Sequence, residues 1–124
     1  MNSIYQEVIL DHYRNPRNHG ALEHPTHRAK GINVSCGDKL QMDILVKNDI
    51  IEEVRFSGVG CAISQASASL LTEAVLKKPL ANALALQPKD VLNLLGVPLS
   101  PSRIKCGLLS LETLQKTISS PTIK

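Results

Sequence analysis

The chain has 124 residues, of which 43% are hydrophobic, and its formal net charge is +3 at pH 7. This length is enough for one domain with an ordinary hydrophobic core, and we expect residues 1–124 to form a single domain. Three aromatic residues are too few for the stacking surfaces on which proteins bind single-stranded nucleic acid, so we expect no nucleic-acid partner.

The N-terminal segment has the pattern of an amphipathic helix over Ser3–Arg14. Ser3 and Gln6 have the spacing of a capping box at its start. Asn15-Pro16 ends the helix, because the residue before a proline avoids helical backbone angles. We expect the following stretch, Asn18–His27, to be a loop. The residues that share the apolar face of the helix are Ile4, Tyr5, Val8, Ile9 and His12.

Three strand patterns follow this loop. They cover Ala29–Val34, Leu40–Val46 and Ile50–Phe56, and Lys47-Asn48-Asp49 forms the turn between the last two. The middle segment alternates apolar and polar residues, which is typical of a strand with one buried face. The short connections favour an antiparallel meander, with one face of the sheet covered by helices.

The second half of the chain has helical periodicity. An apolar stripe from Ile63 to Val75 predicts a long helix, and Leu80–Leu86 and Pro88–Leu95 predict two short helical pieces. Ser100-Pro101 begins a last helix. The sequence therefore predicts an α+β fold, a three-stranded antiparallel sheet covered by helices in the order α-β-β-β-α-α-α. The apolar stripe of the last helix is Ile104, Leu108, Leu111, Leu114 and Ile118.

The three cysteines are the residues that most clearly indicate chemistry. Cys36 precedes a Gly-Asp turn that contains Asp38, Cys61 follows a Gly-x-Gly loop at a helix start, and Cys106 lies in a helix beside basic residues. These surroundings suit exposed, activated thiolates. Three thiolates and one carboxylate make four ligands, the number that a tetrahedral Zn²⁺ takes, and they also suit an iron–sulfur centre.

Each cysteine also has a structural interpretation. A free cysteine is usually a small buried hydrophobe, and the pattern around Cys106 favours that role and a functional one equally. The carboxylate of Asp38 would raise the pKa of a lone thiol at Cys36, which makes little sense for a bare nucleophile and good sense for two ligands of one cation.

In their order along the chain, these segments resemble the U-type iron–sulfur cluster assembly proteins, the family of SufU, IscU and the N-terminal domain of NifU. The matching motifs are Ile4–Asn18, Cys36-Gly37-Asp38, Gly60–Ser69 and Arg103–Cys106. The resemblance covers nearly the whole chain and implies the SufE/NifU-like fold. Lys105 stands before the third cysteine, where IscU-type scaffolds have histidine, so the chain is most similar to the SufU type.

The resemblance implies Zn²⁺ bound by Cys36, Asp38, Cys61 and Cys106. It also implies that a cysteine desulfurase delivers persulfide sulfur to one of these cysteines. Cys36 is the first choice as acceptor and Cys106 the second, and the sulfur then passes to an iron–sulfur assembly protein or an apo-protein. The expected residues for docking the desulfurase are Tyr5, Arg14, Arg103 and Lys105.

Alternatives to zinc-dependent sulfur transfer stay open at this stage. The alternative within the family is a scaffold on which a [2Fe–2S] cluster is assembled at the same residues. The alternative from another class is a structural zinc module that only binds a partner. The sequence does not decide whether the protein is an enzyme, although a persulfide carrier would act as a sulfurtransferase.

The cellular setting follows from what the sequence lacks. No apolar run approaches the roughly 20 residues that span a bilayer, and the N-terminus has no signal-peptide pattern. An odd number of cysteines fits a reducing compartment better than a disulfide framework. We therefore expect a cytoplasmic protein that makes no contact with membranes.

Overall fold

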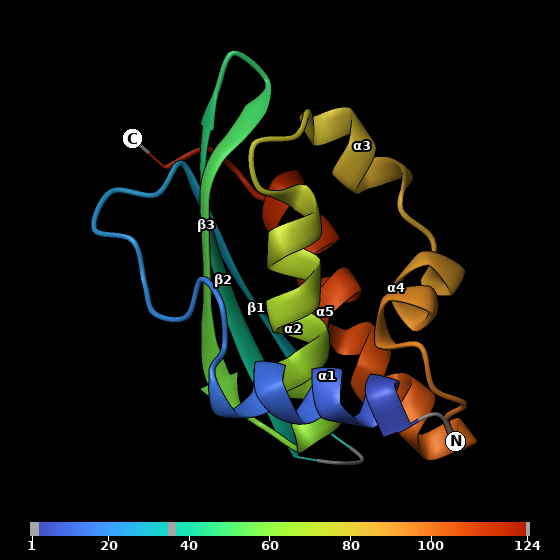
Figure 1. Ribbon diagram of the computed structural model, residues 1–124. Helices are drawn as coiled ribbons and strands as arrows, with labels where there is room; N and C mark the ends of the chain where they lie inside the picture. Colours follow the sequence, from blue (N-terminus) through green and yellow to red (C-terminus); the bar gives the residue numbers. More distant parts are fainter. Residues whose placement is uncertain (1–2, 35–36, 124) are drawn as a thin grey trace.

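The computed structural model describes residues 3–34 and 37–123, with the backbone alone for residues 3–5. It confirms the predicted α+β class (Figure 1). The predicted order named three helices after the sheet, whereas four are present in the described chain because each short helical piece forms its own helix. The elements are α1 (Ser3–Arg14), β1 (His27–Asn33), β2 (Asp38–Lys47), β3 (Ile50–Val59), α2 (Ala62–Val75), α3 (Leu80–Ala85), α4 (Pro88–Leu95) and α5 (Pro101–Ser119).

The sheet is the antiparallel meander that the strand patterns predict, in the order β1-β2-β3. Its third strand runs past the predicted end at Phe56 as far as Val59, with Gly58 opposite Leu40. Gly58 has a φ of 146°, and a Cβ there would overlap the carbonyl oxygen of Lys39. Only glycine fits this position, and the strand that it extends carries the chain directly to the start of α2.

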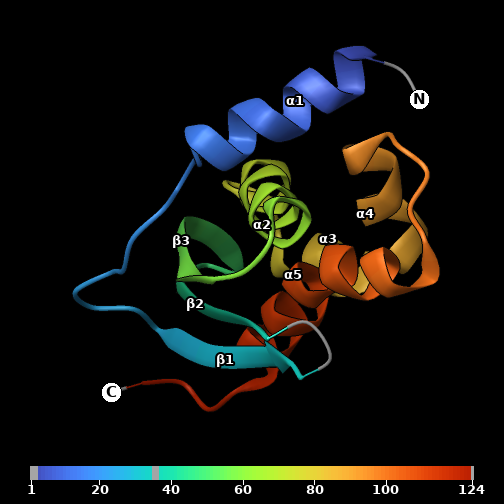
Figure 2. The same ribbon diagram turned by 90° about the horizontal axis from the view of Figure 1, so that it is seen from below.

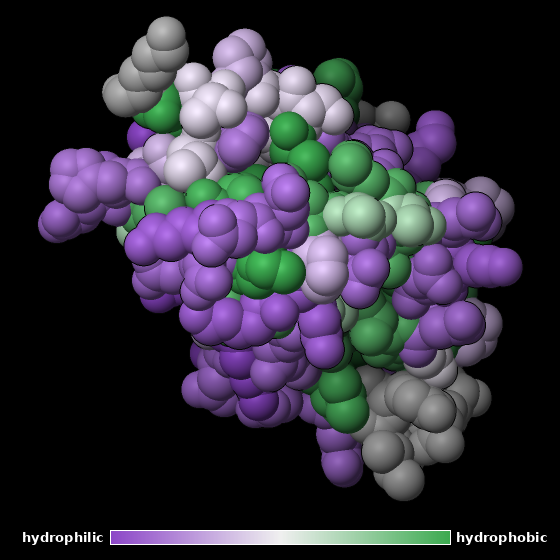
Figure 3. All heavy atoms as spheres, turned by 90° about the horizontal axis from the view of Figure 1, so that it is seen from above, coloured by the Kyte–Doolittle hydropathy of each residue, from purple (hydrophilic) through white to green (hydrophobic). Residues whose placement is uncertain are grey.

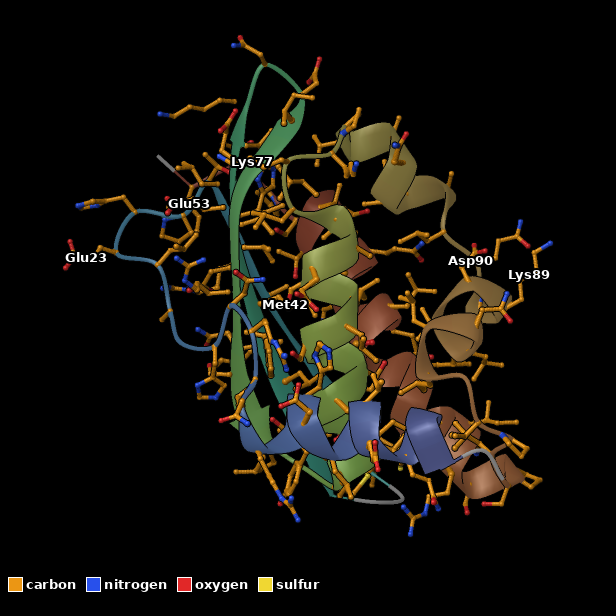
Figure 4. All side chains as sticks on the ribbon, in the orientation of Figure 1. Glu23, Met42, Glu53, Lys77, Lys89 and Asp90 are labelled. Atoms are coloured by element: carbon orange, nitrogen blue, oxygen red, sulfur yellow. The ribbon has the colours of Figure 1, made fainter. Side chains whose placement is uncertain are left out.

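Helices α2 and α5 lie side by side on one face of the sheet, and α1 crosses the end of α2 (Figures 1 and 2). The main core fills the space between the sheet and these helices, and Met42 of β2, labelled in Figure 4, is fully buried in it. On the other face of the sheet, the guanidinium of Arg28 binds both carboxylate oxygens of the buried Asp43, at 2.7 and 2.9 Å. That carboxylate also accepts the backbone N–H of Leu22, which ties the loop before β1 to the sheet.

The burial of α5 differs from the predicted stripe. Of the five predicted core positions, only Leu111 and Leu114 are fully buried, because α5 packs against β1 on one side and against α2 and α4 on the other. A helix enclosed on two sides buries a wider face than one apolar stripe indicates. The residues that it buries are Cys106, Gly107, Leu109, Ser110, Leu111, Thr113, Leu114 and Thr117.

A buried polar contact joins α1 to α2. The Nδ1 atom of His12 lies 2.7 Å from the hydroxyl oxygen of Ser69, which also accepts the backbone N–H of Arg17. Its Nε2 atom lies 3.5 Å from the carboxylate of Glu73. Burial lowers the pKa of His12, with a smaller contribution from the Arg17 charge. Burial therefore favours the neutral imidazole in this contact between α1 and α2.

Cys61 and Cys106 lie at one end of the sheet, and the surface on the opposite side of the molecule is mixed in hydropathy. Figure 3 views that far side, where hydrophobic groups reach the surface between hydrophilic ones. Scattered apolar residues of this kind are normal on a protein surface. Among the helices of the described chain, none is long and apolar enough to cross a membrane.

Candidate metal centre

Three of the four predicted metal ligands converge at one end of the sheet. Asp38 begins β2, Cys61 is the N-cap of α2, and Cys106 lies in the second turn of α5. One potential ligand atom from each lies within 4.8 Å of the other two. Figure 2 looks onto this end, where the chain passes from β3 into α2 beside α5. Two sulfurs and a carboxylate from distant parts of the sequence can therefore reach one cation.

The Asp38 carboxylate is the group that most clearly indicates a cation. Its side chain is only 1% exposed, and Oδ1 accepts the backbone N–H of Cys61 at 3.1 Å. Its other oxygen, Oδ2, is buried without a hydrogen-bond partner among the described residues. A buried carboxylate oxygen with no partner is costly, and a bound cation removes that cost. The residues present therefore fit a metal ion.

Gly60 allows this arrangement by bringing the backbone very close to the site. A Cβ at Gly60 would overlap the Ser64 hydroxyl and would lie 2.8 Å from Oδ1 of Asp38. The same hydroxyl donates to the carbonyl of Cys61 at 3.1 Å, and its oxygen lies 4.0 Å from the sulfur of Cys61. The glycine of this motif is thus required by packing at the site.

Cys106 differs from the sequence-based expectation of an exposed thiolate. It is only 2% exposed, whereas Cys61 is partly exposed. The reason is that the face of α5 that carries Cys106 packs against α1, α2, the end of α4 and the segment after α4. Its sulfur also lies 4.0 Å from the amide nitrogen of Asn33. The apolar cluster that includes Cys106 consists of Ile9, Ile63, Ala66, Leu95 and Val97.

Cys36, the fourth predicted ligand, lies outside the described residues. The chain on either side of it is placed by backbone contacts. Asn33 is the register partner of Asp38, and its carbonyl accepts the backbone N–H of Gly37 at 2.9 Å. The connection that contains Cys36 in the sequence therefore starts and ends beside the site.

A groove of about 440 Å³ shares the lining residues Ile9, Ile63 and Val97 with the apolar cluster that includes Cys106. Most of its lining consists of apolar residues from α1, α2 and the segment before α5, and Arg103 also lines it. Of the predicted docking residues, Arg103 and Lys105 are exposed on the first two turns of α5, and Arg14 is exposed at the end of α1. The side chain of Tyr5 lies outside the described part of the chain. The structure thus brings Arg103 beside the groove but does not include Arg14 in its lining.

Two residues near the sulfurs were missed by sequence reasoning, namely Asn33 and Ser64. Neither belongs to a residue type that singles out a metal site. The available signals were positional, because Asn33 is at the predicted strand end before Cys36 and Ser64 is one helical turn after Cys61. The close packing at Gly60 is what links Ser64 to the site, and the contact with the buried Cys106 is what links Asn33 to it.

Comparison with known proteins agrees with this geometry. The NifU-like N-terminal domain family matches residues 4–122. The zinc-dependent sulfurtransferase SufU of Bacillus subtilis is 36% identical over 136 residues, covering 96% of this chain and 92% of SufU. The iron–sulfur cluster assembly scaffold protein IscU of Aquifex aeolicus is 43% identical over 126 residues, covering the whole chain and 80% of IscU.

A solved structure supports the same assignment. The crystal structure of SufU from Fervidobacterium islandicum, named as an iron–sulfur cluster assembly scaffold protein for the SUF system, superimposes with a TM-score of 0.79 at 30% identity, covering 94% of this chain and 98% of that one. The family match spans nearly the full sequence and includes every residue of the candidate centre. The chain therefore belongs to the NifU-like N-terminal domain family.

Proposed function

We propose that this protein accepts sulfur from a cysteine desulfurase for iron–sulfur cluster assembly and holds a zinc ion at the candidate centre. The observation that carries the proposal is the convergence of Asp38, Cys61 and Cys106, with the second carboxylate oxygen of Asp38 buried and unpartnered among the described residues. Cys36 is the proposed fourth ligand. The Bacillus subtilis relative is a zinc-dependent sulfurtransferase, and this similarity supports the interpretation.

The donor set suits this chemistry. Three cysteine sulfurs and one carboxylate oxygen match the four ligands of zinc, and the carboxylate makes the set weaker than four thiolates. A bound zinc ion keeps coordinating thiolates deprotonated at neutral pH. A structural zinc module normally has four strong ligands, so the carboxylate favours a site that opens.

The proposed acceptor is Cys36. Its thiolate attacks the outer sulfur of the protonated desulfurase persulfide and forms a new S–S bond. The old S–S bond breaks, and its electron pair leaves with the desulfurase cysteine as a thiolate. Proton and charge are both conserved, because one thiolate is consumed and another released, and no oxidant is needed. Cys106 is the second choice, since a side chain that is only 2% exposed cannot reach the outer sulfur of a docked persulfide without a local movement.

We further propose that the desulfurase docks beside the groove that Arg103 borders. Arg103 and Lys105 are exposed, and no ion pair engages either one among the described residues. They therefore suit an acidic surface around the persulfide loop of the partner. Arg14 and Tyr5 remain candidates on the first helix.

A second candidate function is a scaffold on which a [2Fe–2S] cluster is assembled at the same residues. The specific observation in its favour is the 43% identity to the Aquifex IscU. That alignment covers 126 residues, which is close to the length of this chain. The alignment with the Bacillus SufU is longer than this chain, so that relative contains residues with no counterpart here. Against the scaffold, Lys105 offers no imidazole beside Cys106.

Metal analysis and an absorption spectrum of freshly purified protein distinguish the two functions. Stoichiometric zinc in a colourless solution is the expected result, whereas iron and acid-labile sulfide in a coloured solution would establish the scaffold. Alanine release by the cognate desulfurase then tests the acceptor. We expect wild-type protein to stimulate turnover and folded Cys36→Ser to abolish the stimulation. Full stimulation by Cys36→Ser would refute the acceptor assignment.

A further inference from the structure

We propose that Asn33 is a positioning residue for the candidate centre, through an N–H···S hydrogen bond from its side-chain amide to Cys106. The inference rests on the proposed function, because it assigns a role to Asn33 at the same metal site. The distance from Nδ2 of Asn33 to Sγ of Cys106 is 4.0 Å, at the long end for a hydrogen bond to sulfur. This contact joins the end of β1 to the second turn of α5.

The backbone of Asn33 is fixed independently of its side chain. Asn33 is paired with Asp38 across the β1–β2 ladder, and its carbonyl accepts the backbone N–H of Gly37 at 2.9 Å. The side-chain amide is therefore carried on a fixed strand end. Asn33 is paired with the proposed ligand Asp38, and its amide reaches the proposed ligand Cys106. A side chain held in this way can fix the direction of the Cys106 sulfur.

The chemistry of the contact favours the ligand form of Cys106. A neutral thiol is a weak hydrogen-bond acceptor, whereas a thiolate accepts a charge-assisted bond. The Asn33 amide does not titrate, so it can donate at every pH at which the protein is folded. By drawing electron density from the sulfur, the bond lowers the energy of the thiolate lone pairs and makes the sulfur a poorer nucleophile. Cys106 is thereby stabilised as a retained ligand.

The test uses Co²⁺ alone as the probe, in full-length protein from which zinc has been removed. Asn33→Leu replaces the amide with an apolar group of similar size, and Asn33→Ala removes it by truncation. The matched control is Asn93→Leu, which removes an exposed amide from α4. The readouts are the thiolate-to-cobalt charge-transfer bands and cobalt affinity, measured by competition with a chromophoric chelator. Thermal unfolding of each metal-free variant checks the fold.

Loss of the N–H···S bond raises the energy of the thiolate lone pairs, so we expect the charge-transfer bands of both Asn33 variants to move to longer wavelength. We expect their cobalt affinity to fall about tenfold, as for other groups that orient metal ligands. Asn93→Leu should match wild type in both readouts. Unchanged bands and affinity in either folded Asn33 variant would overturn the inference.

The two proposals fail in different ways. If wild-type protein stimulates the desulfurase while the Asn33 variants bind cobalt as wild type does, the role of Asn33 is refuted and the proposed function stands. If the cobalt spectra depend on Asn33 but folded, zinc-loaded protein does not stimulate its desulfurase, sulfur transfer is refuted and the role of Asn33 stands. If wild-type protein does not bind cobalt or zinc, both proposals are refuted.

Discussion

Replacing Asp38 with alanine separates the contribution of this carboxylate to the metal site from its contribution to the fold. In the metal-free protein two effects oppose each other. The variant loses the hydrogen bond from the Cys61 N–H to a charged acceptor, worth about 1.5–3 kcal/mol. It also removes a carboxylate oxygen that is buried without a partner among the described residues, whose desolvation costs a similar amount. We therefore expect the metal-free stability to stay within about 2 kcal/mol of wild type.

In the presence of zinc the effects no longer cancel. Ligand binding at 100 times the dissociation constant stabilises a fold by about 2.7 kcal/mol. Loss of an outer-shell partner weakens metal binding about 10–100-fold, so loss of a ligand should weaken it at least about 100-fold. The same zinc concentration then stabilises the variant by only about 0.4 kcal/mol. For a chain of this size the difference corresponds to a zinc-induced rise in Tm that is smaller by about 9 °C.

The assay is thermal unfolding of wild type and Asp38→Ala, each with and without zinc at one fixed concentration. Asp43→Ala is the matched control, because Asp43 is also a buried aspartate of β2 but binds Arg28. It should lower Tm with and without zinc by the same amount and leave the zinc-induced rise intact. A zinc-induced rise in folded Asp38→Ala equal to that of wild type would show that Asp38 is not a ligand.

Three other perturbations test separate parts of the structure. Gly60→Ala should destabilise the protein by about 1–3 kcal/mol in urea unfolding and should also reduce its zinc affinity, because the new Cβ would displace Ser64 and Asp38. Zinc affinity equal to that of wild type would contradict the close packing. Wild type should lose stability as the pH falls through the ordinary pKa of histidine, and His12→Gln should lack this loss. Burial lowers the pKa of folded His12, so the unfolded chain takes up the proton more readily, and equal pH profiles for the two proteins would refute this role. Arg103→Glu should raise the desulfurase concentration needed for half-maximal stimulation, while Lys89→Glu on α4 (Figure 4) should not; equal effects would place docking elsewhere.

Most of the fold could be predicted because its signals are local. The helix over Ser3–Arg14 has the same bounds in the structure, and the three strands differ by at most three residues at their ends. The largest difference is at the end of β3, where Gly58 indicated a turn. The structure keeps this glycine in the strand, since its conformation is defined by the neighbouring strand at Lys39. A contact between strands leaves no mark in the local pattern.

Sequence reasoning named residues that could bind a metal, but it could not describe their environment. Cys61 and Asp38 stand beside glycines that the motif pattern singled out, and the structure places both at the centre. The burial of Cys106 was not predictable, because it depends on the segment after α4 closing over α5. Asn33 was missed for the same reason, since its closeness to Cys106 arises only when α5 packs on β1.

The candidate residues Asp38, Cys61 and Cys106 lie on β2, at the N-cap of α2 and on α5, so a metal ion held by them would link three elements of the fold. Each element is placed by contacts that do not involve a metal. Asp38 is fixed by pairing with Asn33, Cys61 by the packing at Gly60, and Cys106 by an apolar cluster. The donor atoms are thus brought together by folding, and the oxygen of Asp38 is left without a partner among the described residues. A bound cation would relieve that cost and tie the sheet to α2 and α5. Any step that releases a cysteine from the metal would therefore loosen the contacts between these elements as well as free a thiolate.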